Sequence, residues 1–114
     1  MPDDPEFVFV YTTLPDANAA KSLSLALVEE RLAACVNIHA EMTSIYEWQG
    51  KIETGPEVPV FIKTRRDLAQ RVIDFSRPRH PYTVPCFLIL PIVGGNEDYL
   101  AWARTQTLVK SAPP

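Results

Sequence analysis

The sequence predicts an α+β fold, a sandwich with the element order β-α-β-β-α-β and an added C-terminal helix. Apolar residues recur with the period of a helix in two long segments and with the period of a strand in the segments between and around them. The 114 residues are also enough to bury one core without disulfides or a structural metal. We therefore expect a single domain over residues 1–114, with frayed ends at 1–5 and 108–114.

The first strand and the first helix follow each other directly. Residues 6–14, EFVFVYTTL, form a β-branched and aromatic run that is typical of a strand buried on both faces. The run ends before Pro15, and Asp16 is a suitable N-cap. Residues 17–34 then repeat apolar side chains at helical spacing, which predicts a helix of about five turns.

A long β-hairpin is predicted between residues 35 and 65. The period changes to two over residues 35–48, a turn follows at 49–51, and residues 51–65 return as the partner strand. We expect a break or bulge at residues 54–56, because Pro56 cannot donate to a ladder. Arms of about 15 residues reach about 50 Å, whereas the first helix spans only about 27 Å. The hairpin therefore outruns the helices that cover the sheet.

A second helix, a fourth strand and a last short helix complete the order. Asp67 and Gln70 have the spacing of a capping box, and the apolar helical pattern behind them stops before Pro78. Residues 84–93 are predicted to be a strand, and residues 94–96 precede a short helix. This order is the ferredoxin-like, split βαβ pattern.

The far part of the hairpin is too apolar to remain in contact with water. The stretch TSIYEWQGKIE carries four large apolar side chains, Ile45, Tyr46, Trp48 and Ile52. We favour a second chain as the cover, because the excess strand edges also need backbone partners. The alternative is that the C-terminal helix folds over the hairpin within one chain, and composition leaves both open.

Charge and composition exclude several classes of partner. With 11 basic and 14 acidic residues the formal charge is -3, so we expect neither nucleic acid nor an anionic membrane as a partner. The start MPDDPEF lacks the features of a signal peptide, and no apolar run approaches the roughly 20 residues of a spanning helix. Cys35 and Cys86 lie in apolar surroundings and are read as reduced thiols. We therefore expect a cytoplasmic protein.

Five stretches of the sequence resemble a known family. VEERLAACVNI, TSIYEWQGKIE, VFIKTR, RHPYTVP and LPIVGGNEDYLAW resemble, in this order, the recurring blocks of the CutA family of divalent-cation tolerance proteins, over residues 8–102. The resemblance implies a ferredoxin-like subunit, a homotrimer built through the hairpin, and a cytosolic role in tolerance of copper and other divalent cations. It also implies a structural similarity to PII signalling proteins, which are trimers that bind small effectors between subunits.

The resemblance also suggests where a metal would bind. Copper binding in some members of the family is attributed to a cysteine at the end of the first strand and to a His-His pair before the Pro-Tyr motif. The cysteine position holds Tyr11 or Thr12 here, and the pair reads Arg79-His80, so that only His80 remains. One imidazole does not supply the three or four ligands of Cu(II) or Zn(II), unless the three His80 side chains of a trimer converge. His80 is the candidate metal ligand, and we favour the alternative of a hydrogen-bonding pocket residue.

A ligand cleft is the second site that the resemblance implies. It places Trp48, Lys63 and Tyr82 near an inter-subunit cleft together with His80. A lysine, a histidine and two aromatic rings suit a small anionic or planar ligand. In the alternative, Lys63 pairs with Glu57 or Glu47, and the aromatic rings fill the subunit interface.

Cys86 is the last candidate of this cleft, six residues after His80, where many family members carry glutamate. A Cys86–His80 nucleophile pair is one alternative. We favour Cys86 as a small buried residue on the face of Val84, Leu88 and Leu90 in the predicted strand. The missing carboxylate argues against acid–base chemistry, so we predict a non-enzyme without an organic cofactor.

Taken together, these observations predict a trimeric divalent-cation tolerance protein that binds copper or zinc weakly or conditionally. Its expected partners are copies of itself and divalent cations. The alternative is a PII-like sensor or adaptor trimer whose inter-subunit cleft binds a small anionic ligand.

Overall fold

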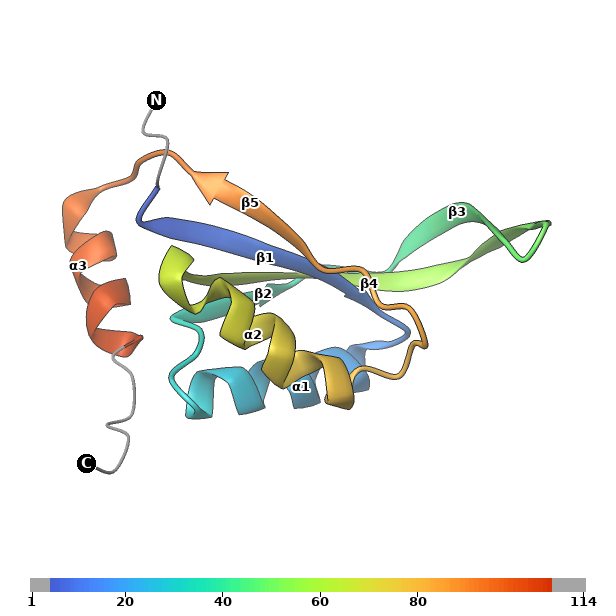
Figure 1. Ribbon diagram of the computed structural model, residues 1–114, viewed down its shortest axis with the longest axis horizontal. Helices are drawn as coiled ribbons and strands as arrows, with labels where there is room; N and C mark the ends of the chain where they lie inside the picture. Colours follow the sequence, from blue (N-terminus) through green and yellow to red (C-terminus); the bar gives the residue numbers. More distant parts are fainter. Residues whose placement is uncertain (1–4, 108–114) are drawn as a thin grey trace.

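The computed structural model describes residues 5–107, and their elements follow the predicted order (Figure 1). The strands are β1 (Phe7–Leu14), β2 (Cys35–Ile38), β3 (Met42–Trp48), β4 (Lys51–Arg65) and β5 (Leu88–Ile92). The helices are α1 (Ala17–Glu29), α2 (Ala69–Ser76) and α3 (Glu97–Gln106), with short 3-10 turns at η1 (Arg66–Leu68) and η2 (Arg77–Arg79). The fraying predicted for residues 1–4 and 108–114 lies outside the described residues. None of the described helices has the length and apolar character needed to span a membrane.

The sheet is antiparallel, with the strand order β2-β4-β1-β5 and with β3 paired to the far part of β4. The helices α1 and α2 lie on one of its faces (Figure 1). The core between these layers takes its side chains from β1, β4, α1 and α2, mainly Val8, Val10, Leu23, Leu27, Val60, Ile62 and Val72. This arrangement confirms the predicted α+β, ferredoxin-like fold.

Helix α1 begins as the sequence predicts and ends earlier. The Asp16 carboxylate accepts a hydrogen bond from the main-chain N–H of Ala19 at 2.8 Å, which confirms the N-cap. The helix ends at Glu29, because Arg31 takes a left-handed φ of 59° that a helix cannot accommodate. Residues 32–34, predicted to be helical, instead form a buried connection into β2.

The predicted strand over residues 35–48 is divided into β2 and β3. Ile38 lies opposite Val60 and Met42 lies opposite Glu57. From the first pair to the second, the chain moves four residues between β2 and β3 but only three residues along β4. The extra residue is typical of a bulge, and it lies at 39–41 instead of at the predicted 54–56. Pro56 is tolerated inside an unbroken β4, because β1 ends opposite residue 58 and leaves that edge of β4 without a ladder.

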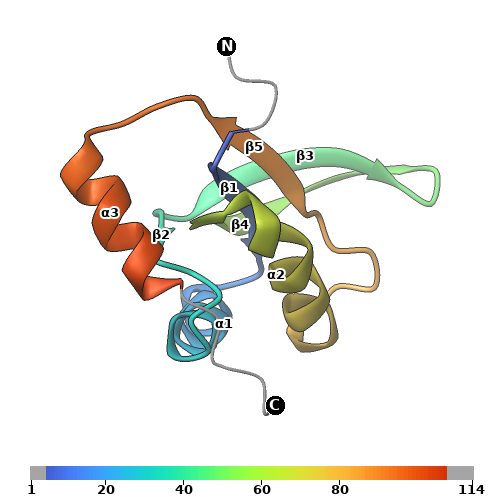
Figure 2. The same cartoon turned by 60° about the vertical axis from the view of Figure 1, so that its left-hand side comes forward.

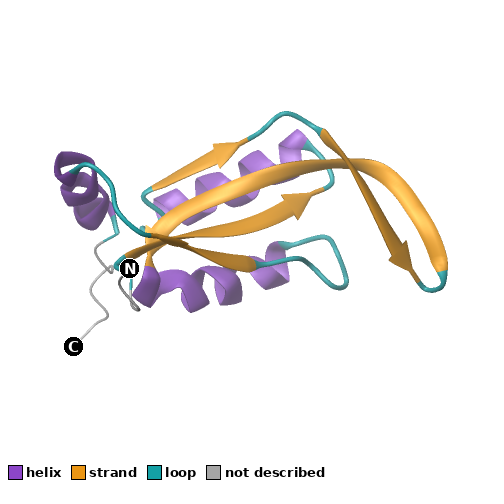
Figure 3. Cartoon of the chain, turned by 90° about the horizontal axis from the view of Figure 1, so that it is seen from above, coloured by secondary structure: helices purple, strands orange, loops and turns teal. Residues whose placement is uncertain are grey.

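The hairpin turn forms where the sequence predicts it. Gln49 and Gly50 have φ angles of 50° and 81°, as the two central residues of a tight two-residue turn require. The β3–β4 arm extends past the ends of both covering helices (Figures 1 and 3). Ile45 and Ile52 near its end are 71% and 69% exposed.

The C-terminal helix does not cover this hairpin. Helix α3 lies at the opposite end of the molecule and apart from α1 and α2 (Figures 1 and 2). Ala103 of this helix packs with Phe7 and Ala34 in a small second core. The guanidinium of Arg104 holds the helix to the carboxylate of Glu6, with an Nη2–Oε1 distance of 2.8 Å. The alternative in which α3 folds over the hairpin within one chain is therefore wrong.

The start of the second helix differs from its prediction. The η1 turn precedes α2, and no side chain caps either element by a hydrogen bond. Gln70 donates to the Asp74 carboxylate at 3.0 Å, and Asp67 lies 3.5 Å from the Nε atom of Arg65. The predicted capping box is therefore wrong, because both side chains have other partners.

The last strand is shorter and more exposed than predicted. β5 begins at Leu88, and residues 81–87 form an extended loop. Val84, Leu88 and Leu90 are 65%, 56% and 39% exposed, so they do not form the predicted buried face. The reason is that β5 lies at the sheet edge and pairs only with β1 among the described strands.

Candidate functional site

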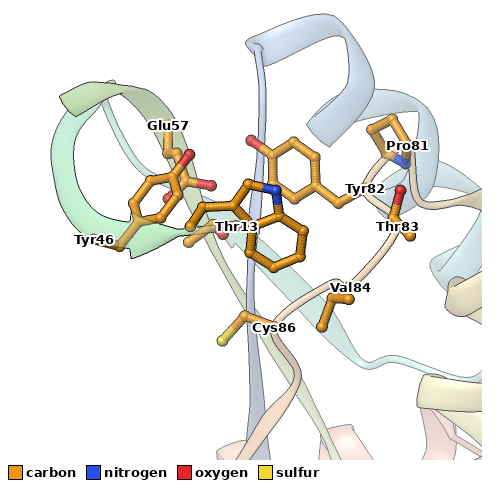
Figure 4. Close-up of a pocket in the computed structure, with 9 residues that line it drawn as sticks. Thr13, Tyr46, Glu57, Pro81, Tyr82, Thr83, Val84 and Cys86 are labelled. Atoms are coloured by element: carbon orange, nitrogen blue, oxygen red, sulfur yellow. The ribbon is translucent and has the colours of Figure 1, made fainter. Parts of the chain in front are cut away.

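A hollow of about 440 Å³ opens where the hairpin leaves the sheet (Figure 4). Its lining comes from β1, β3, β4 and the loop before β5, and comprises Thr13, Tyr46, Trp48, Glu57, Pro81, Tyr82, Thr83, Val84 and Cys86. The pairing of Met42 with Glu57 fixes the register, and side chains alternate along a strand. Tyr46, Trp48 and Glu57 therefore share one face of the hairpin.

Glu57 determines the electrostatics of this hollow, because it is the one charged residue of the lining. Burial, together with the nearby Glu57 carboxylate, raises the pKa of Tyr82 to about 12. The same two causes, burial first, raise the pKa of the Cys86 thiol. Both groups are therefore protonated at neutral pH, and Cys86 is a weak nucleophile in this setting.

His80 is buried behind the hollow and uses both of its ring nitrogens. Nε2 lies 2.9 Å from the main-chain oxygen of Thr13 and 3.2 Å from the hydroxyl of Thr12, and Nδ1 lies 3.3 Å from the main-chain nitrogen of Tyr82. This pattern requires a proton on Nε2, which donates to Thr13, and a free Nδ1, which accepts from Tyr82. Burial lowers the pKa of His80 and thus favours the neutral ring.

The hydrogen bonds of His80 compete with the binding of a metal ion, because they occupy both ring nitrogens. A copper or zinc ion on His80 would have to replace one of them. Within residues 5–107, no three side chains of histidine, cysteine, aspartate or glutamate are placed to hold one ion. Zinc and copper sites ordinarily use three or four such donors. The residues that one chain brings together therefore do not fit a dedicated metal site.

The structure separates Lys63 from the other residues predicted for the cleft. Trp48, Tyr82 and Cys86 line the hollow, and His80 lies behind Tyr82. Lys63 lines a different hollow of about 150 Å³, beside α3, where its Nζ atom lies 5.5 Å from the ring centroid of Tyr99. Within the described chain it also makes no ion pair with a hairpin glutamate, contrary to the alternative drawn from the sequence. The predicted grouping is therefore not present within one chain.

Cys86 is half-buried and lines the hollow, so the preferred prediction of a buried strand position is wrong. Cys35 is half-buried as well, and both thiols are free. His39 is exposed and packs its ring against Phe61, with 5.0 Å between centroids. Neither Cys35 nor His39 lines the hollow.

Six residues of the lining were not identified as site residues from the sequence: Thr13, Tyr46, Glu57, Pro81, Thr83 and Val84. Thr13 and Tyr46 were read as parts of strands, and Glu57 only as a partner of Lys63. A signal for two of them exists, because a two-residue turn at Gln49-Gly50 fixes the pairing of the whole arm. That pairing places Glu57 on the same face as Tyr46.

Comparisons with known proteins agree with the fold and the sequence blocks. Residues 8–106 match the family model described as CutA1 divalent ion tolerance protein. The chain is 47% identical to Protein CutA of Homo sapiens over 97 residues, which are 85% of this chain and 54% of the human one. It is 44% identical to the divalent-cation tolerance protein CutA of Thermus thermophilus over 98 residues, 86% of this chain and 95% of that protein. It thus spans about half the length of the human relative and nearly all of the bacterial one.

A solved structure shows the same similarity in three dimensions. The crystal structure of CutA1 from the psychrotrophic bacterium Shewanella sp. SIB1 superposes with a TM-score of 0.88 at 39% sequence identity. The superposition covers 95% of this chain and 99% of that one. Sequence and structure therefore agree over nearly the whole chain, which belongs to the CutA1 divalent ion tolerance protein family.

Proposed function

We propose that the chain acts in divalent-cation tolerance as a cytoplasmic homotrimer that binds copper or zinc weakly. Membership of the divalent ion tolerance family supports the tolerance role. The observation that carries the assembly is the uncovered hairpin. Its apolar side chains Ile45, Tyr46, Trp48 and Ile52 are between 44% and 71% exposed. Tyr46 and Trp48 lie on one face of the hairpin and Ile45 and Ile52 on the other, and exposed apolar side chains on both faces are typical of an interaction surface.

A second apolar surface supports a ring of copies. The face of the sheet opposite α1 and α2 carries the rings of Phe9, Tyr11 and Phe61, whose centroids lie 5.1 to 5.9 Å apart in the two contacting pairs. Leu88 and Leu90 of the edge strand β5 pair with Tyr11 and Phe9 and are exposed. Two different surfaces suit a head-to-tail contact, and the smallest ring that such a contact closes is a trimer.

Weak metal binding follows from the donors of one chain. His80 offers an imidazole only when it gives up a hydrogen bond to Thr13 or Tyr82. Further donors have to come from other subunits or from solvent. We propose that the metal is not stored in a preformed site and that its binding depends on assembly.

Native mass spectrometry of the metal-free protein, titrated with Cu(II) and then with Zn(II), tests this proposal. We expect a trimer that takes up one ion per chain or one per three chains. His80→Ala should lose the ion, whereas His39→Ala, which removes the exposed histidine, should keep it. A monomer, or equal uptake by both folded variants, would contradict the proposal. Circular dichroism checks that each variant is folded, and subcellular fractionation checks the proposed location.

A second function is favoured by the hollow itself. At about 440 Å³ it falls in the range of roughly 300–1,000 Å³ that small-molecule sites occupy. It also lies beside Trp48, which belongs to the exposed hairpin surface, so that another copy would close it further. We propose on this ground that the trimer is a sensor or adaptor that binds a small ligand in the hollow.

We further propose that the protein is not an enzyme. The raised pKa of Cys86 keeps its thiol protonated. The lowered pKa of His80 keeps its ring neutral, and the ring is hydrogen-bonded to the main chain of Thr13. Neither group is prepared for nucleophilic or acid–base chemistry. Assays with generic ester, phosphate and amide substrates should show no turnover above the His80→Ala variant.

A further inference from the structure

We propose that the hollow beside the hairpin binds a small organic cation, an ammonium group carried on a compact apolar body. This inference rests on the second proposed function, in which the hollow is a ligand site. The proposed cation replaces the anionic ligand that the sequence suggested. The charge and shape of the lining support this choice.

The charge that one chain contributes to the lining disfavours an anion. Among the nine lining residues, Glu57 is the one that carries a charge, and the charge is negative. Lys63, the cation expected to bind an anionic ligand, lies in the other hollow, near Tyr99. An anion in the hollow would meet the Glu57 carboxylate without a compensating positive charge, which opposes binding. A cation in the hollow would be attracted by the Glu57 carboxylate, which favours binding.

Three aromatic rings make the lining suitable for an organic cation. Tyr46 and Trp48 come from β3, and Tyr82 comes from the loop that His80 holds. Figure 4 shows Tyr46 and Tyr82 on either side of the hollow, with the carboxylate of Glu57 between them in this view. Aromatic faces attract ammonium groups within about 6 Å. Aromatic side chains together with one carboxylate suit the recognition of an ammonium group.

The donor set distinguishes an organic cation from a bare metal ion. Calcium takes about six to eight oxygen ligands, and copper or zinc takes three or four nitrogen, sulfur or oxygen ligands. The hollow offers one carboxylate, a protonated thiol at Cys86 and the hydroxyls of Thr13 and Thr83. Within one chain this set is too small for a metal ion. It is sufficient for an ammonium group with one polar substituent.

The sharpest test compares two probes that differ only in charge. Choline and 3,3-dimethyl-1-butanol have the same shape, with a quaternary nitrogen in the first and a carbon in the second. Isothermal titration calorimetry of each with the full chain should show binding of choline and at least about tenfold weaker binding of the neutral analogue. Equal affinity for the two would overturn the cationic preference and leave a ligand site for neutral molecules.

Variants of the hairpin locate the binding. Glu57→Gln removes the charge at constant shape and should weaken choline binding about tenfold or more. Glu47→Gln makes the same change on the opposite face of the same hairpin and should leave the affinity unchanged. Tyr46→Leu removes one ring and should weaken binding about threefold. Similar losses in Glu57→Gln and Glu47→Gln would show a general charge effect and overturn the inference.

The outcomes also separate this inference from the first proposed function. A trimer that takes up copper but does not bind choline would overturn the inference and keep the metal function. A protein that binds choline through Glu57 but takes up no copper would keep the inference and overturn the metal function. Binding of neither probe would remove both the inference and the ligand-site function on which it rests.

Discussion

The Nε2 atom of His80 lies 2.9 Å from the main-chain carbonyl oxygen of Thr13, and this hydrogen bond ties the loop before β5 to the central strand β1. The other ring nitrogen accepts from the N–H of Tyr82, two residues further along the loop. The histidine thus holds Tyr82 at the hollow. Its most direct role is to position the lining.

The pH dependence of stability should report this role. Burial lowers the pKa of His80 in the folded chain, against an ordinary value near 6.5 when unfolded. Below about pH 6.5 the unfolded state therefore binds a proton that the folded state does not. The free energy of unfolding should fall as the pH decreases through this window, and above it His80 should add no pH dependence. Urea denaturation between about pH 5 and pH 8 measures the slope.

His80→Gln should reduce that slope and lower the free energy of unfolding at neutral pH by about 1–3 kcal/mol, because a buried hydrogen-bonded group is lost. His39→Gln removes the exposed histidine and should leave the slope below pH 6.5 unchanged. The interpretation fails if the two variants show the same pH profile.

Trp48→Arg should weaken assembly, because it places a charge in the surface that we propose to be buried between copies. Sedimentation velocity at several protein concentrations should show a shift from trimer toward monomer. Ser22→Arg adds the same charge to the exposed side of α1 and should leave the profile as in the wild type. An unchanged sedimentation profile of Trp48→Arg would refute the proposed interface.

Thr64→Val should destabilise the chain by about 1–2 kcal/mol at nearly constant volume. The buried hydroxyl of Thr64 donates to the main-chain oxygen of Leu32 at 2.6 Å, and valine leaves that oxygen without this donor. Thr54→Val is the control, because Thr54 is exposed on the same strand. Chemical denaturation at neutral pH measures both, and equal effects would contradict this role of the hydrogen bond.

Arg104→Ala should loosen α3. The guanidinium bonds to the carboxylates of Glu6 and Glu97 and thus joins the helix to the residue before β1. Hydrogen exchange of the amides of residues 97–106 should become about two- to fivefold faster at low salt, and the difference should shrink at high salt. Arg71→Ala, on α2, should leave these amides unchanged. A salt-independent difference would instead point to packing.

Local patterns in the sequence determined most of the elements. The apolar run of β1, the Asp16 cap and the two-residue turn at Gln49-Gly50 each depend on neighbours in the chain, and the structure contains all three. The capping box at Asp67 failed for the opposite reason. Its side chains found other partners, Arg65 for Asp67 and Asp74 for Gln70, and spacing alone does not exclude them.

Exposure was harder to predict than secondary structure. The apolar residues Val84, Leu88 and Leu90 suggested a buried strand, but the segment forms an edge strand and the loop before it. Apolar composition shows that a surface avoids water, and it does not show whether the same chain or another copy covers it. The position of α3, far from the hairpin, decided that question for one chain.

The sequence by itself determined the ferredoxin-like order of elements and the excess length of the hairpin, because these depend on local periodicity, and its five motif stretches carried the family resemblance. Only the tertiary structure decided the composition of the hollow. It brought Glu57 of β4 together with Tyr82 and Cys86 of the loop before β5 and placed Lys63 elsewhere. The physical reason is that strand register and loop docking set which side chains converge, and the hydrogen bond between His80 and Thr13 forms only when the chain is folded.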